Sequence, residues 1–172
     1  MKYQKFLINN ELFLHLNFQT VDTTWIYDIE RKTWSKGPNM NNKRSFHACL
    51  ADQSTSSIHV MGGCQDPELE WNSEGIHLSS TETWIFGTDS WKPSANLPER
   101  VEKSAAVPSN SDEYVGYMVG GRTFGLKEER FSRKIWALRR KNMTWIEMNK
   151  KLETGRRRHS LVNVPEATVL GC

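Results

Sequence analysis

The stretch from Thr23 to Gly63 alternates short apolar segments with polar connections. Four such segments follow one another, and the last, SIHVM at 57–61, runs directly into the doublet Gly62-Gly63. Alternating or continuous apolar runs with β-branched residues suit a half-buried strand. A glycine pair supplies positive φ or room for another backbone. The pattern therefore predicts a small unit built of β-strands.

The same order of features occurs twice more along the chain. Trp25-Ile26-Tyr27 has counterparts at 84–86 and 136–138, and the single tryptophans that follow these segments are spaced 57 and 54 residues apart. A repeat of about 50 residues with several strands per unit is typical of β-propellers. We expect repeat units at 23–63, 80–121 and 131–172, and a degenerate strand from a preceding unit within 1–22.

Aromatic rings recur at fixed places in these units. The polar turn of each unit is flanked by a large apolar side chain and a tryptophan: Tyr27 and Trp34, Phe86 and Trp91, and more weakly Leu138 and Trp145. Burial of one such ring contributes about 2–3 kcal/mol. The pair in the second unit persists although its turn is two residues shorter. We therefore expect the rings to be core residues that the fold requires.

Together these features resemble the kelch repeat family. Its pattern is a strand ending in Gly-Gly, followed by an aromatic residue and a tryptophan about seven residues apart. The doublets Gly62-Gly63 and Gly120-Gly121 match it, as do the ring pairs. An Arg-x-x-His step before the first strand matches at 44–47 and 156–159, whereas the middle unit has Val101 and Ser104 in those places. The resemblance covers residues 11–172.

The resemblance implies an all-β fold, a partial kelch β-propeller of about three four-stranded antiparallel blades. Propellers close with four to eight blades, so three blades leave open sheet flanks. Near the end of the chain, Gly171 would begin a third doublet and Cys172 stands in place of its second glycine. We therefore expect an incomplete propeller that can associate through its open edges.

The resemblance also implies where a protein partner binds. Related propellers often use the residue after the glycine pair and residues near the Arg-x-x-His step. Carried over position by position, these are Cys64, Arg122, Phe46, Lys103 and Arg158. Arginine at two of these positions suits an acidic peptide, because a guanidinium group can bind a carboxylate through two hydrogen bonds.

Two connections between second and third strands, 64–80 and 122–130, are expected to be surface loops. Trp71 lies in the first of them and has no counterpart in the other units. Its ring either tucks back onto its own sheet or forms an exposed anchor for a partner, since tryptophan is favoured at interface hot spots.

The composition is that of an ordinary globular protein, with 37% hydrophobic and 25% charged residues among 172. Three widely spaced cysteines predict free thiols in a reducing compartment, and hence a cytoplasmic protein. The apolar stretch near the N-terminus is interrupted at 9–11 by Asn-Asn-Glu, so we expect neither a secretion signal nor a membrane segment.

Charge is distributed unevenly. Residues 51–121 contain three basic and eleven acidic side chains, whereas 122–158 contain thirteen basic and four acidic ones. The basic runs fall in turns of the repeat and no nucleic-acid motif accompanies them. They predict a solvated or partner-facing basic edge rather than a nucleic-acid interface.

No recognised catalytic motif is present, and the five histidines show no metal-ligand spacing. We therefore expect no enzyme activity, no cofactor and no metal. The leading hypothesis is a non-enzymatic protein-interaction module. In the family such modules serve as substrate-recognition parts of ubiquitin-ligase adaptors or bind actin. The alternative is a fragment of a kelch-propeller enzyme, oxidoreductase-like, whose catalytic residues lie outside this chain.

Overall fold

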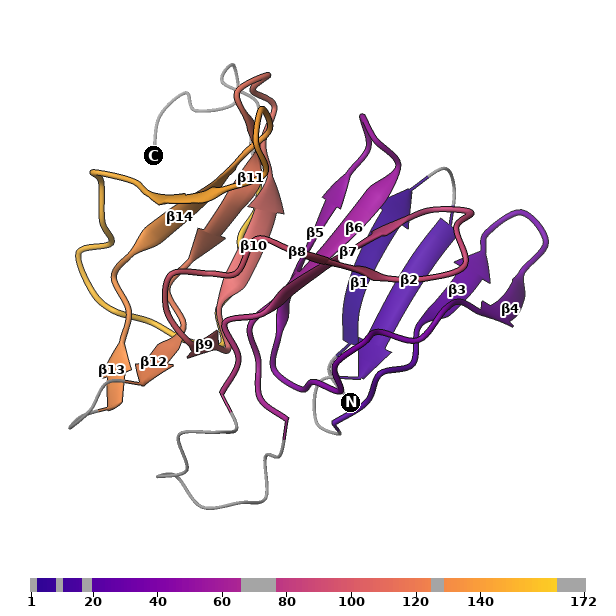
Figure 1. The fold of residues 1–172 in the computed structure, drawn as a ribbon, viewed down its shortest axis with the longest axis horizontal. Helices are drawn as coiled ribbons and strands as arrows, with labels where there is room; N and C mark the ends of the chain where they lie inside the picture. The colour runs from indigo at the N-terminus through magenta and orange to yellow at the C-terminus, as the bar shows by residue number, and fades with distance from the viewer. Residues whose placement is uncertain (1–2, 9–10, 17–19, 66–76, 125–128, 164–172) are drawn as a thin grey trace.

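The computed structural model (Figure 1) describes residues 3–8, 11–16, 20–65, 77–124 and 129–163. Every regular element in these ranges is a β-strand, and all pairings between strands are antiparallel. The predicted all-β fold is therefore confirmed. The described residues contain no helix of the length and apolarity that crossing a membrane requires.

Three four-stranded sheets follow one another along the chain, each with its strands in sequence order. The first contains β1 (Tyr3–Ile8), β2 (Glu11–Leu16), β3 (Trp25–Asp28) and β4 (Thr33–Lys36). The second contains β5 (Ala48–Asp52), β6 (Ser57–Met61), β7 (Thr81–Ile85) and β8 (Lys92–Ser94). The third contains β10 (Ala105–Pro108), β11 (Tyr114–Val119), β14 (Ile135–Arg139) and β15 (Trp145–Glu147).

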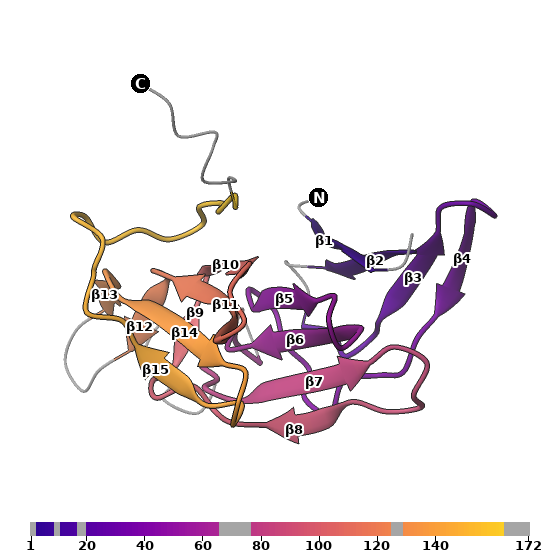
Figure 2. The ribbon, with the colours of Figure 1, turned by 90° about the horizontal axis from the view of Figure 1, so that it is seen from above.

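The three sheets are arranged as blades in an arc (Figure 2). The first sheet lies at one end of the arc, the third at the other, and the second between them. The first strands of the blades, β1, β5 and β10, contact one another in succession. This arrangement is that of a partial β-propeller, in which each blade touches only its neighbours.

The first two repeat units predicted from the sequence each span two sheets. Unit 23–63 contains the two outer strands of the first sheet and the two inner strands of the second, and unit 80–121 bridges the second and third sheets in the same way. The N-terminal stretch 1–22 contains β1 and β2, which complete the first sheet. The chain therefore moves to the next sheet in the middle of each of these two sequence repeats.

The glycine doublets form the contact between successive units. The N–H of Gly63 donates a hydrogen bond to the carbonyl of Val101 (2.8 Å), and the N–H of Gly121 donates to that of Arg156 (2.8 Å). The first glycine of each doublet has a positive φ, 64° at Gly62 and 63° at Gly120. A Cβ on Gly62 would collide with the Val101 carbonyl oxygen. Only glycine allows the backbone of the next unit to come this close.

A side chain from one blade is buried in the same cluster as the tryptophans of the next blade. Met40, in the connection after β4, is buried in one cluster with Trp84 and Trp91 of the second sheet. The Trp91 indole N–H also donates to the carbonyl of Pro38 (3.0 Å), in the same connection. The first blade thus supplies part of the second blade's core.

The second blade repeats this contact on the third. Leu97 is buried in one cluster with Trp136 and Trp145. It follows Trp91 by six residues, as Met40 follows Trp34. The backbone is fixed in the same way in both cases, because the N–H of Met40 donates to Asp22 (2.7 Å) and that of Leu97 to Ser79 (2.8 Å). We call Met40 and Leu97 insert residues.

The recurring rings are buried in the second and third blades but not in the first. Trp91 and Trp145 are buried, whereas Trp34 is 48% exposed and Trp25 is 44% exposed. Tyr27 and Trp34 do face each other across β3 and β4, with ring centroids 4.8 Å apart. The expected burial of Trp34 is wrong because no insert residue from another blade covers this pair in the described part of the chain.

The shortened turn of the second unit changes the ring contacts. The β7–β8 pairing ends at Thr83 and Lys92, so Phe86 and Trp91 are not opposite each other in the ladder. Trp84 lies between them, with ring centroids 5.8 Å from Phe86 and 5.9 Å from Trp91. In the third blade, Leu138 and Trp145 are opposite each other as expected.

The segment 122–130, expected to be a surface loop, contributes two strands. β12 (Arg122–Phe124) pairs with β13 (Glu129–Phe131) and with β9 (Val101–Glu102) in a small three-stranded sheet. Isolated bridges join Ser45 to Cys64 and Cys64 to His77 in the equivalent place of the preceding unit. The connections after the glycine doublets therefore form backbone hydrogen bonds between strands, which could not be predicted from their irregular, charged sequences.

We predict that Gly62→Ala destabilises the fold by about 3 kcal/mol or more, because the variant combines an unfavourable φ with a steric collision against a backbone carbonyl. Gly87→Ala is the matched control. Gly87 has a φ of 85°, and an added Cβ there would meet nothing within 4 Å. Its cost should be about 1–2 kcal/mol, from φ alone.

Urea unfolding followed by tryptophan fluorescence measures both costs. Equal losses of unfolding free energy in the two variants would show that the approach of Val101 to Gly62 does not constrain the fold.

Candidate partner-binding face

Three of the predicted contact residues occupy the same backbone position in successive units. Phe46, Lys103 and Arg158 have φ values of 53°, 56° and 54°, in the left-handed region that side chains other than glycine rarely adopt. The N–H of Lys103 donates to the carbonyl of Phe46 (2.8 Å), and the N–H of Arg158 donates to that of Lys103 (2.8 Å). These hydrogen bonds offset the strain of the left-handed conformation. We call the three residues the ladder.

The side chains of the ladder stack on one another. The Lys103 ammonium lies 4.3 Å from the centroid of the Phe46 ring, and the Arg158 guanidinium carbon lies 5.9 Å from it. A cation over an aromatic face is attracted by the ring quadrupole. Phe46 is half-buried and the Lys103 side chain is only 8% exposed, whereas Arg158 is exposed. The ladder thus presents its most accessible positive charge at Arg158.

A buried carboxylate supports the ladder from below. The Glu102 side chain is 1% exposed and contacts Lys103 Nζ (2.7 Å), Arg122 Nη2 (2.6 Å) and His77 Nδ1 (3.5 Å). Burial by itself would raise the pKa of this carboxyl. The hydrogen bonds from His77 and Lys103 and the charges of Lys103 and Arg122 outweigh burial and lower the pKa to about 2. Glu102 is therefore ionised at neutral pH.

Arg122, predicted to contact a partner, lies inside this cluster. It is 6% exposed and forms an ion pair with Glu102, and its guanidinium carbon lies 4.7 Å from the centroid of the Phe124 ring. Phe124 in turn stacks on His77, with centroids 3.3 Å apart and planes 10° from parallel. In this conformation Arg122 holds the site together from beneath its surface.

The remaining predicted contacts have different settings. Cys64 is 2% exposed, and its sulfur lies 3.1 Å from the Ser45 hydroxyl. Burial raises the pKa of its thiol to about 11, so the thiol is neutral at physiological pH. Trp71 lies outside the described residues. The structure therefore brings Phe46, Lys103 and Arg158 together, with Arg158 the exposed member, and places the side chains of Lys103, Arg122 and Cys64 below the surface.

Sequence reasoning missed four residues of this face, Glu102, His77, Phe124 and Arg157. The guanidinium carbon of Arg157 lies 4.7 Å from the centroid of Phe131, a ring that is 48% exposed. Two of the missed residues directly precede ladder residues in the chain, Glu102 before Lys103 and Arg157 before Arg158. Their shared position, directly before a ladder residue, could have identified both of them from the sequence repeats.

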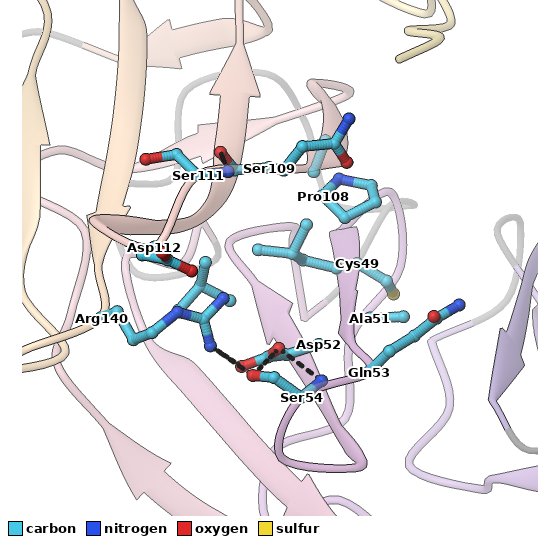
Figure 3. Close-up of a pocket in the computed structure, with 14 residues that line it drawn as sticks. Cys49, Ala51, Asp52, Gln53, Ser54, Pro108, Ser109, Ser111, Asp112 and Arg140 are labelled. Carbon is cyan, nitrogen blue, oxygen red and sulfur yellow. Dashed lines mark hydrogen bonds and ion pairs between the residues drawn. The ribbon is translucent and has the colours of Figure 1, made fainter. Parts of the chain in front are cut away.

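A cavity of about 570 Å³ lies at the C-terminal ends of β5 and β10, away from the ladder (Figure 3). Arg140, in the turn after β14, donates hydrogen bonds to Asp52 Oδ2 (2.7 Å) and Ser54 Oγ (2.6 Å) of the second blade. The Asp52 pKa is lowered, because hydrogen bonds from Ser54, Arg140 and Thr55 outweigh the effect of its burial. The contact fastens the turn of the third blade to that of the second.

Comparison with known proteins agrees with this geometry. A family model described as the kelch motif matches residues 16–41. An F-box/kelch-repeat protein of Arabidopsis thaliana is 33% identical over 76 residues, which cover 44% of this chain and 17% of that protein. Kelch-like protein 23 of Homo sapiens is 28% identical over 105 residues, covering 61% of this chain and 16% of that protein, and its Mus musculus counterpart matches equally.

The chain carries kelch repeats. The matched regions correspond to about a sixth of the length of these relatives. In the described ranges, the kelch repeats hold no group of three or more His, Cys, Asp or Glu side chains that could bind a metal ion.

We predict that Glu102→Gln destabilises the kelch blades at pH 7 by about 3 kcal/mol, since the shift of the Glu102 pKa from 4.5 to about 2 corresponds to that free energy. A lowered carboxyl pKa stabilises the folded state above the unfolded-state pKa. The stabilisation is lost as pH falls from about 4.5 towards 2. The difference between wild type and variant should therefore shrink at low pH.

Chemical unfolding of both proteins at pH 7 and pH 3 measures this difference. A gap of equal size at both pH values would show that the ionised carboxylate is not what stabilises the cluster.

Proposed function

We propose that this chain is a non-enzymatic protein-interaction module that binds an acidic segment of a partner protein at the ladder. The observation that carries the proposal is the cation stack of Lys103 and Arg158 over Phe46, held by backbone hydrogen bonds between units. The names of the matched relatives, F-box/kelch-repeat and Kelch-like proteins, support a role for kelch repeats in binding proteins.

The charge around the ladder favours carboxylates. Arg156 and Arg158 are exposed and Arg157 is half-buried, so three consecutive guanidinium groups lie at this edge. Glu102 is already neutralised by Lys103 and Arg122 below the surface. A carboxylate of the partner could bind Arg158 through two hydrogen bonds, while an apolar side chain beside it would contact Phe46.

We further propose that the partner is a substrate captured for a ubiquitin ligase. Support comes from the relative that is named for an F-box together with kelch repeats. Association with actin and a cytoplasmic location are weaker proposals, which rest on the resemblance and on the free buried thiols of Cys49 and Cys64. We also propose that the chain associates through the open faces of its two end sheets.

A binding experiment tests the proposed face. The probe is a fluorescein-labelled glutamate-rich decapeptide, and a glutamine-rich peptide of equal length is the neutral comparison. We expect the acidic peptide to bind more tightly, and Arg158→Glu to weaken its binding at least about tenfold because the variant replaces an attraction by a repulsion. Fluorescence anisotropy titration gives both dissociation constants.

Lys141→Glu provides the matched control, since it makes the same change of charge at an exposed residue in the β14–β15 turn, at the far end of the blade. Its affinity for the acidic peptide should stay within about twofold of wild type once the long-range charge effect is screened by physiological salt. Equal effects of the two variants would contradict a specific site at the ladder.

A further inference from the structure

Among the residues that the structure describes, the blade-to-blade contact made twice inside the chain leaves one half of itself unused at each end of the arc. At the first blade, the rings of Trp25 and Trp34 are 44% and 48% exposed. The tryptophans of the other two blades, Trp84 with Trp91 and Trp136 with Trp145, are buried, each pair in one cluster with an insert residue. The first blade thus has a receiving surface without an insert.

The third blade has an insert for which the described ranges contain no receiving surface. Leu152 follows Trp145 by seven residues, at the place of Met40 and Leu97 in the earlier blades. Its N–H donates to the carbonyl of Arg133 (2.8 Å), as Met40 bonds to Asp22 and Leu97 to Ser79. The Arg133 side chain also donates to the Leu152 carbonyl (2.6 Å). Leu152 is nevertheless only half-buried, unlike Met40 and Leu97.

We propose that a second copy of this chain supplies the missing half at each end. Leu152 of one copy inserts between Trp25 and Trp34 of the other, and the reverse contact forms at the same time. This contact rests on the association through open faces proposed above, with a second copy of the chain as the partner. Burial of two indole rings and a leucine side chain provides the driving force.

The number of copies in the assembly follows from the need to close the ring of blades. The contact is heterologous, since an insert on one blade meets a tryptophan pair on a different blade, and such contacts either close into a ring or continue into a filament. Each chain contributes three four-stranded sheets. Two copies therefore form a ring of six blades, within the range of four to eight in which propellers close.

Measurement of mass in solution tests the inference. Sedimentation equilibrium of the wild-type chain should give twice the 19.9 kDa of one copy. Leu152→Asp and Trp34→Asp should each weaken the dimer at least about tenfold, because each places a carboxylate in an apolar contact. Ile85→Asp is the matched control, since Ile85 is 52% exposed on the middle blade, and it should leave the mass unchanged.

Three results would overturn the inference. A wild-type chain that stays monomeric over a wide concentration range would exclude the second copy and leave the exposed pair to a different protein or segment. Larger, concentration-dependent species would exclude closure at two copies. A dimer that survives both Asp variants would keep the proposed association but exclude this contact.

Chemical cross-linking keeps the test valid if an Asp variant unfolds. Trp34→Cys and Leu152→Cys are made separately in a Cys172→Ser background, in which Cys49 and Cys64 are buried. A short bismaleimide should join the two variants when they are mixed, and it should join neither variant to itself. Cross-linking within one variant alone, or absence of cross-linking in the mixture, would contradict the head-to-tail arrangement.

Discussion

The hydrogen bonds from the glycine doublets to the next unit are the contacts on which the arrangement of the blades depends. Gly63 bonds to Val101 and Gly121 to Arg156, at the same distance in both cases. Each bond requires the preceding glycine to have a positive φ and no side chain, because the neighbouring carbonyl lies where a Cβ would be. The spacing of the blades is thus determined by backbone, and side chains fill what remains between them.

The candidate binding face is a consequence of the same constraint. When each unit docks on the doublet before it, the third residues of the Arg-x-x-His step and of its equivalent in the middle unit come into line, and Phe46, Lys103 and Arg158 bond to one another through their backbones. Their side chains are thereby brought close together, with both cations over the ring of Phe46. The fold provides the positions, while the particular sequence makes this edge cationic.

Features that repeat along the chain could be predicted from the sequence, because equivalent positions of successive units need the same type of residue. The doublets and the ring positions were found in this way, whereas the three ladder residues were carried over from the resemblance to kelch repeats. The roles of Arg122 and Trp34 could not be predicted, since each depends on a neighbour in space. Glu102 forms an ion pair with Arg122 between the adjacent strands β9 and β12. Trp34, in the described part of the chain, has no insert residue like the one that is buried with Trp91.

The offset between sequence repeats and sheets has a consequence for shortening or dissecting this protein. A cut at the end of a sequence repeat, just after Gly63, would separate β6 from β7 and expose the backbone groups of both. A cut between Lys36 and Ala48 would leave all pairings between the named strands intact. The boundaries of the sequence repeats are therefore not the boundaries along which the folded molecule divides.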